Sequence, residues 1–179
     1  MVTIRQTDLQ SYIRSIPDFP KKGVVFRDIT TLLMDKDAFR AAIELFRRKY
    51  ANSGITKIVS VESRGFIFGS ALAYAIDAGF VPVRKPKKLP AQTIREEYQL
   101  EYGADALEMH TDALSRKDRV LIVDDLLATG GTILAACALV HRLQATIHGL
   151  AFLIELSFLG GRKHLGEYDI FSLITYDRE

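Results

Sequence analysis

Apolar residues recur along the chain with two kinds of spacing. Short apolar runs predict strands that are buried on both faces of a parallel sheet. Apolar positions three and four residues apart predict amphipathic helices. The expected strands are residues 58–61, 80–83, 120–123, 146–154 and 169–174, and the expected helices are residues 5–15, 36–50, 65–78 and 131–143. Because strands alternate with helices, we predict an α/β fold in which helices flank one parallel sheet with right-handed crossovers.

The pattern changes between residues 90 and 112. This segment is polar, and Tyr98, Leu100 and Tyr102 alternate with polar neighbours. Alternation of this kind predicts a β-hairpin or a flexible arm, which we place over the carboxyl edge of the sheet as a lid. The length of 179 residues predicts one domain, residues 1–179.

Composition narrows the class of protein. A hydrophobic content of 48% and a charged content of 26% are ordinary for a globular protein. A net charge of +2 argues against nucleic acid as a partner, because such proteins rely on a large basic surface. The chain begins without the apolar region of a signal peptide and has no apolar stretch long enough for a bilayer, so we expect a cytoplasmic location and no membrane partner.

The strand expected at residues 120–123 is followed by two acids, Asp124 and Asp125. Ligands of open α/β sheets bind at the carboxyl ends of the strands, which is where these carboxylates are expected. Small residues then open the next helix, and free amides at a helix start bind anions. The small residues are Ala128, Thr129, Gly130, Gly131 and Thr132. Carboxylates for a diol and a loop for a phosphate predict a sugar phosphate as ligand.

A second anion site is expected beside the first. Arg64 and Gly65 follow the strand at residues 58–61, at the start of a helix. The next strand ends in Arg84-Lys85-Pro86-Lys87-Lys88, with four cations in five residues. By itself, such a basic run is equally consistent with a solvent-exposed surface and with a binding site. Next to Arg64 it favours a diphosphate site, and a sugar with a phosphate and a diphosphate describes phosphoribosyl pyrophosphate (PRPP).

The segment from Val120 to Thr132 resembles the PRPP signature of type I phosphoribosyltransferases, and it contains neither a Walker loop nor a G-x-G-x-x-G motif. Further blocks resemble the adenine phosphoribosyltransferase family and cover nearly the whole chain. They are Pro17-Asp18-Phe19-Pro20, Gly23 to Ile29, Ser63-Arg64-Gly65-Phe66, Arg84 to Pro90 and Leu100-Glu101-Tyr102-Gly103. The resemblance implies the type I fold and a Mg²⁺-dependent reaction in which adenine and PRPP give AMP and pyrophosphate, with an oxocarbenium-like transition state.

The resemblance also implies a role for each matching residue. Residues 1–34 would form a hood over the base, in which Val25, Phe26 and Arg27 bind adenine; without the resemblance, these would be an ordinary core strand. Asp124 and Asp125 would bind the ribose, and the loop of residues 128–132 the 5-phosphate. Pyrophosphate would lie on Ser63, Arg64, Arg84, Lys85 and Lys88. In the arm, Glu101 would act as general acid or base and Tyr102 would help to close the site, the alternative being a solvated glutamate.

Four further expectations follow from the resemblance. Mg²⁺ would bind mainly through PRPP and water, so that no residue is assigned as a metal ligand. The chain would form a homodimer with Arg84 near the interface. A cis peptide bond would join Glu62 and Ser63. Ser60 and Lys87 stand where many relatives have glycine, which affects the geometry of the two loops.

Three other functions share parts of this pattern. A phosphoribosyltransferase for a carbonyl base would need a hydrogen-bond donor where adenine requires an acceptor, so the segment Val25–Arg27 discriminates. A PRPP-sensing regulator would keep the fold without catalysis and would usually add a DNA-binding segment. A PRPP-producing kinase shares the acidic signature but would need an ATP site, for which the sequence shows no motif.

Overall fold

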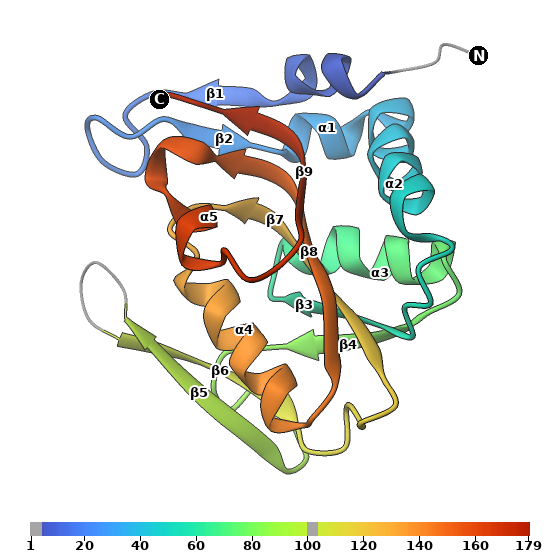
Figure 1. Ribbon diagram of the computed structural model, residues 1–179. Coiled ribbons are helices and arrows are strands. Elements are labelled where there is room, and N and C mark those ends of the chain that lie inside the picture. Colours follow the sequence, from blue (N-terminus) through green and yellow to red (C-terminus); the bar gives the residue numbers. More distant parts are fainter. Residues whose placement is uncertain (1–4, 100–103) are drawn as a thin grey trace.

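A central sheet of five parallel strands organises the computed structural model, which describes residues 5–99 and 104–179 (Figure 1). The strand order is β4-β3-β7-β8-β9, and every neighbouring pair is parallel. The strands are β3 (Lys57–Val61), β4 (Gly79–Val83), β7 (Arg119–Leu127), β8 (Thr146–Leu156) and β9 (Ile170–Tyr176). The predicted α/β fold with a parallel sheet is therefore confirmed.

Helices cover both faces of this sheet, which is why its central strands are apolar throughout. On one face, α2 (Lys36–Tyr50) and α3 (Gly65–Ala75) pack against Leu121 and Val123 of β7. On the other face, α4 (Gly131–Arg142) packs against Ile122. Alternate residues of a strand point to opposite faces, so the run at residues 120–123 supplies both halves of the core. The helix predicted at residues 36–50 is confirmed, and α3 ends at Ala75, before the predicted residue 78.

A β-hairpin leaves the edge of the sheet and packs along α4 (Figure 1). It consists of β5 (Thr93–Gln99) and β6 (Ala104–His110), which pair antiparallel. A backbone bridge between Arg84 and Glu108 ties it to the end of β4. The hairpin predicted within residues 90–112 is thus confirmed, and its turn, residues 100–103, lies outside the described residues.

The N-terminal segment differs from its prediction. Instead of one helix over residues 5–15, it contains a 3₁₀ helix, η1 (Gln6–Tyr12), followed by strand β1 (Arg14–Ile16). β1 pairs antiparallel with β2 (Phe26–Asp28), and α1 (Thr30–Met34) follows. Residues 14–16 form a strand despite their helical pattern, because they gain backbone hydrogen bonds with β2.

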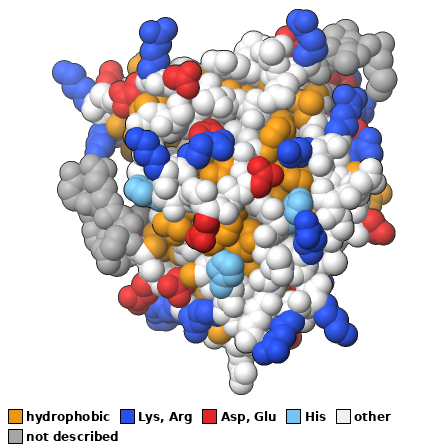
Figure 2. All heavy atoms as spheres, viewed as in Figure 1, with side chains coloured by type: hydrophobic (Ala, Val, Ile, Leu, Met, Phe, Trp, Pro, Cys, Tyr) orange, Lys and Arg blue, Asp and Glu red, His pale blue; other side chains and the backbone are white. Residues whose placement is uncertain are grey.

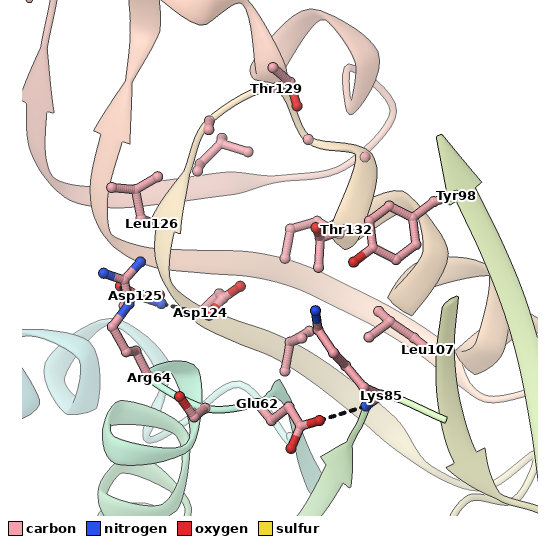
Figure 3. A pocket seen from close by; sticks show the side chains of 17 residues that line it. Glu62, Arg64, Lys85, Tyr98, Leu107, Asp124, Asp125, Leu126, Thr129 and Thr132 are labelled. Atoms are coloured by element: carbon pink, nitrogen blue, oxygen red, sulfur yellow. Dashed lines mark hydrogen bonds and ion pairs between the residues drawn. The ribbon is translucent and has the colours of Figure 1, made fainter. Parts of the chain in front are cut away.

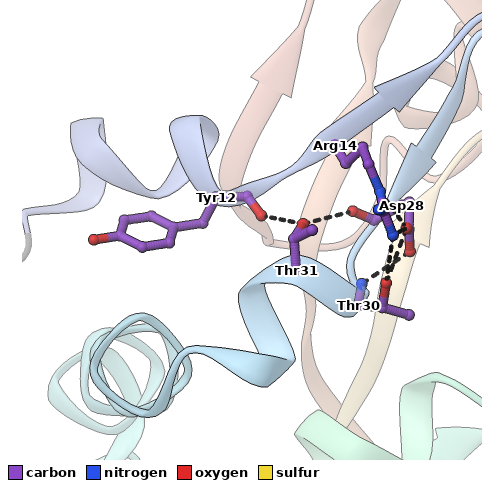
Figure 4. A network of polar contacts seen from close by, with 5 residues as sticks. All are labelled: Tyr12, Arg14, Asp28, Thr30 and Thr31. Atoms are coloured by element: carbon purple, nitrogen blue, oxygen red, sulfur yellow. Dashed lines mark hydrogen bonds and ion pairs between the residues drawn. The ribbon is translucent and has the colours of Figure 1, made fainter.

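A polar network around Asp28 holds these N-terminal elements together (Figure 4). The Asp28 carboxylate accepts a hydrogen bond from the Thr30 amide at 2.9 Å and pairs with the Arg14 guanidinium at 2.6 Å. The Thr31 hydroxyl donates to the Tyr12 carbonyl at 2.6 Å. The hydrogen bond from the Thr30 amide, aided by Arg14, lowers the pKa of Asp28 to about 2. This segment is therefore fixed by a carboxylate that stays ionised at neutral pH.

Two short elements complete the chain, η2 (Ser157–Leu159) and α5 (Gly161–His164). Over residues 5–99 and 104–179, no helix combines the length and apolarity that crossing a membrane requires. On the face in Figure 2, the described basic side chains are interspersed with acidic ones.

Candidate active site

A cavity of about 420 Å³ opens at the carboxyl ends of β3 and β7, in front of the start of α4 (Figure 3). Its wall is formed by two stretches of the main sheet and its loops together with three single side chains. The lining residues are Val61 to Arg64, Asp124 to Ile133, Lys85, Tyr98 and Leu107. The two predicted anion sites thus share one cavity, and the hairpin closes one of its sides.

The acid pair lies inside a strand rather than after it. β7 continues to Leu127, so the predicted strand end at Val123 is wrong. The apolar run stops at residue 124, but pairing with β8 extends the ladder past it. Asp125 is only 5% exposed and pairs with Arg64 (Nε to Oδ2, 2.8 Å). Asp124 lies next to it in the cavity wall (Figure 3).

Burial governs the protonation of this pair. It raises the pKa of Asp124 well above the usual range, and the adjacent charge of Asp125 raises it further. Burial also raises the pKa of Asp125, while the Arg64 guanidinium opposes that rise. Gly65 leaves the space that Asp124 occupies, because a Cβ at residue 65 would stand 2.5 Å from its Oδ1. The glycine after Arg64 is thus required by the acid across the cavity.

The loop of residues 128–132 turns from β7 into α4 and presents the start of that helix to the cavity. A second layer supports it from behind. A Cβ on Gly161 of α5 would stand 2.2 Å from the carbonyl oxygen of Ala128. The His164 ring nitrogen Nδ1 lies 3.0 Å from the Thr129 carbonyl oxygen. The sequence did not indicate this support, because α5 has four residues and no helical repeat to recognise.

The basic run after β4 is held by carboxylates. Glu62 accepts hydrogen bonds from the Lys85 amide at 2.7 Å and from Arg84 Nε at 2.8 Å. Glu108 accepts from the Lys87 amide at 3.0 Å, and Lys87 has a φ of 66°, in the region that favours glycine. Lys87 therefore adopts a backbone conformation typical of the glycine that it replaces. The expected cis bond between Glu62 and Ser63 is present.

Only part of the predicted pyrophosphate set lines the cavity. Ser63, Arg64 and Lys85 belong to its wall, whereas Arg84 and Lys88 do not, although both are among the described residues. The Arg84 guanidinium pairs with Glu62, which does line the cavity, and donates to the Lys88 carbonyl at 3.2 Å. The binding of pyrophosphate by Arg84 and Lys88 stays a prediction.

The segment predicted to bind the base lies beside the cavity, outside its wall. The Phe26 ring centre is 5.5 Å from the guanidinium carbon of Arg64, which does line the wall. The exposed ring of Phe19 packs edge-on against Phe26, with 5.3 Å between centroids. Val25 and Phe26 are only partly buried, so they are not an ordinary core strand. The Arg27 side chain points away, stacking on Tyr176 at 3.9 Å.

Glu101 and Tyr102, the predicted residues of the arm, lie outside the described residues. Sequence reasoning missed two hairpin residues that the structure brings to the site. Tyr98 and Leu107 line the cavity. The alternation that predicted the hairpin was the available signal, but the side of the hairpin that faces the cavity depends on how it packs.

Comparison with known proteins agrees with this geometry. The family model described as "Phosphoribosyl transferase domain" matches residues 29–175. A curated adenine phosphoribosyltransferase of Solibacter usitatus is 55% identical over 171 residues, which cover 96% of this chain and 99% of that protein. The chain belongs to the adenine phosphoribosyltransferase family.

Solved structures of adenine phosphoribosyltransferases share the fold over almost the full length. The enzyme of Thermoanaerobacter pseudethanolicus superposes with a TM-score of 0.93 at 52% identity, covering 96% of this chain and 100% of that one. The enzyme of Saccharomyces cerevisiae, in complex with an imino-altritol bisphosphate and adenine, gives a TM-score of 0.89 at 38% identity, covering 94% and 97%. The fold is therefore that of a type I phosphoribosyltransferase.

Proposed function

We propose that this protein transfers the 5-phosphoribosyl group of PRPP to adenine, giving AMP and pyrophosphate. The observation that carries the proposal is the single cavity of about 420 Å³ in which an acid pair separates two anion-binding segments. PRPP has the matching order of groups, with a phosphate, a diol and a diphosphate. The family's curated members and solved structures supply the base, adenine.

The ribose 5-phosphate half of PRPP is assigned to β7 and α4. Amides at the start of α4 and the hydroxyls of Thr129 and Thr132 donate hydrogen bonds to the 5-phosphate. Asp124 and Asp125 accept hydrogen bonds from the ribose hydroxyls. In the transition state the negative charge of this pair, which Arg64 favours at Asp125, stabilises the positive charge that develops on the ribose ring.

The diphosphate half is assigned to Ser63, Arg64 and Lys85. The bond between the ribose C1 atom and the diphosphate oxygen breaks, and its electron pair leaves with the diphosphate. Arg64 and Lys85 stabilise that leaving charge. An imidazole nitrogen of adenine forms the new bond to C1, and its proton passes to the Glu101 carboxylate as general base. Tyr102 helps to exclude water.

Adenine is assigned to Val25, Phe26 and Arg27. The Phe26 ring provides the stacking face, the Val25 carbonyl accepts a hydrogen bond from the exocyclic amine, and the Arg27 amide donates to the adjacent ring nitrogen. The contact between Phe26 and Arg64 supports this assignment, since Arg64 is the residue proposed to bind the diphosphate. The Arg27 side chain is already engaged with Tyr176, which leaves the backbone for the base.

The family is consistent with a divalent metal requirement, and we infer Mg²⁺. Among the described residues, no cluster of three or more His, Cys, Asp or Glu side chains is able to hold a metal ion by itself. We infer that the cation would be held mainly by PRPP oxygens and water, as Mg²⁺ prefers, with Asp124 nearby. When bound, Mg²⁺ neutralises part of the charge on the diphosphate.

We also propose a homodimer. The support is a groove of about 500 Å³ between α2 and α3, with Met34 75% exposed and Tyr74 92% exposed at its margin. Large apolar side chains gathered in this way mark protein interfaces. A cytoplasmic location, the hood of residues 1–34 and the closing motion of the arm at residues 90–112 stay predictions from the sequence.

The test is an assay with PRPP and Mg²⁺ in which adenine, hypoxanthine, guanine and xanthine are offered separately. Conversion of adenine alone supports the proposal, and Glu101→Gln should then lower kcat. Turnover of a carbonyl purine would keep the PRPP site and overturn the base assignment. PRPP binding without any turnover would indicate a regulator.

A further inference from the structure

Three cations at or beside the proposed diphosphate end of the cavity are each paired with a carboxylate. Arg64 pairs with Asp125, Arg84 with Glu62, and Lys85 with Asp105, each at 2.8 Å. A diphosphate that binds here must therefore compete with a carboxylate for each cation that it contacts. The three ion pairs differ in how easily a diphosphate can replace the carboxylate.

The Lys85–Asp105 pair is the most exposed of the three. The Asp105 side chain is 24% exposed, against 7% for Asp125 and 11% for Glu62. Separating a partly exposed ion pair costs little, because water solvates the released charge, whereas a buried carboxylate that loses its partner is costly. Lys85 is thus the cation that a diphosphate can take over most readily.

Asp105 reaches Lys85 from the hairpin, outside the motifs that carried the family resemblance. It lies on β6, where its carboxylate also accepts a hydrogen bond from the Ala106 amide at 2.8 Å. The Tyr98 hydroxyl on β5 lies 3.4 Å from the same carboxylate and is also hydrogen bonded to Thr132 of the phosphate loop. These contacts fix a negative charge beside Lys85, which lines the cavity together with Tyr98 and Thr132 (Figure 3).

We propose that Asp105 is an affinity-determining residue that competes with the diphosphate group for Lys85. In the free enzyme it holds Lys85, and PRPP displaces it. The carboxylate weakens the binding of both PRPP and the product pyrophosphate, and it recaptures Lys85 as pyrophosphate leaves. The inference rests on the proposed diphosphate site, to which it adds a residue.

The test is Asp105→Asn in the full-length enzyme, with pyrophosphate and Mg²⁺ as the probe in calorimetry. Loss of the competing charge should lower the Kd of pyrophosphate about 3–10-fold and lower the KM for PRPP in parallel. The KM for adenine should stay unchanged. Asp105→Glu keeps the charge and should return the Kd toward that of the wild type. Asp112→Asn, an exposed aspartate just beyond the hairpin, is the matched control and should change neither value.

Lys85→Met separates this inference from the proposed function. If Lys85 binds diphosphate, Lys85→Met weakens pyrophosphate binding. In that background Asp105→Asn should no longer lower the Kd of pyrophosphate, because there is no Lys85 left to release. If Lys85→Met leaves the Kd unchanged, the diphosphate site itself is wrongly placed. If Lys85→Met weakens binding but Asp105→Asn weakens it too, or leaves it unchanged, Asp105 is not a competitor and the inference is overturned.

Discussion

Gly161→Ala places a methyl group against the loop that is proposed to bind the 5-phosphate. The new Cβ would stand 2.2 Å from the carbonyl oxygen of Ala128 and 3.1 Å from the Gly130 amide nitrogen. Neither atom belongs to a side chain that could rotate away. α5 cannot retreat easily either, because Arg162 is anchored to the buried Glu155 at 2.6 Å. The loop itself must therefore move.

The size of the movement follows from the contact distance. Ordinary van der Waals contact begins at 3.4 Å, so the Ala128 carbonyl must shift by about 1.2 Å. Overpacking of this kind costs about 1–3 kcal/mol of folding free energy. A misplacement of about 1 Å in a positioning element lowers catalysis by about 10²-fold. We expect that loss in kcat/KM for PRPP, with little change in the KM for adenine.

The assay compares three glycine variants of the same segment. Gly160 has a φ of 72° and no atom within 4 Å of its Cβ position, so Gly160→Ala strains the backbone by about 1–2 kcal/mol without touching the loop. In Gly166→Ala the nearest atom is at 3.6 Å, an ordinary contact. Gly161→Ala and Gly160→Ala should both unfold at a lower temperature than Gly166→Ala. In steady-state kinetics, only Gly161→Ala should lose kcat/KM for PRPP.

The reasoning is refuted if Gly161→Ala shows wild-type kinetics with PRPP at any stability. It is also refuted if Gly160→Ala loses as much kcat/KM as Gly161→Ala does, because the loss would then follow from destabilisation. A crystal structure of Gly161→Ala with an unmoved Ala128 would contradict the steric argument directly.

Three further predictions concern stability and reactivity. Because its folded-state pKa of about 2 lies below the unfolded value, Asp28 stabilises the protein fully above about pH 5, and this contribution of about 2 kcal/mol disappears as the pH falls toward 2; urea unfolding should show the wild type losing its advantage over Asp28→Asn across that range. Gly69→Ala should destabilise the fold because its Cβ would overlap the hydroxyl of Ser60, and adding Ser60→Gly should recover part of the loss in thermal unfolding; no recovery would contradict the overlap. Burial raises the pKa of Cys137 to about 12, so iodoacetamide at pH 8 should label it only after unfolding, and rapid native labelling would disprove its burial.

Features carried by continuous patterns could be predicted from the sequence. The strand at residues 120–123 could be recognised from a continuous apolar run, because both of its faces are buried. α2 could be recognised from apolar residues at helical spacing, because one of its faces is buried. Arg64 and the acid pair could be placed in one cavity because they follow two parallel strands, which bring their carboxyl ends to one edge. The hydrophobic pattern and the motif of each segment were sufficient to predict these features.

Features that depend on distant pairing could not be predicted in the same way. Residues 14–16 form a strand because β2 lies beside them, although their own pattern favours a helix. Arg84 and Lys85 are neighbours in one basic run, yet Arg84 pairs with Glu62 and does not line the cavity, whereas Lys85 does. Asp105 carries no signal in the sequence, because its meeting with Lys85 depends on the packing of the hairpin.

The two segments that we propose to bind anions follow strands that are direct neighbours in the sheet, with Ser60 of β3 opposite Val123 of β7. Hydrogen bonding fixes neighbouring strands at about 4.8 Å from each other. Arg64 follows β3, whereas the loop of residues 128–132 follows β7, which continues past Val123 to Leu127. The distance between the two proposed anion sites is therefore set by the sheet and by the length of β7 beyond β3. Such a site selects its ligand by length: a sugar with only one phosphate would reach one of the two sites, and a longer polyphosphate chain would extend past the other.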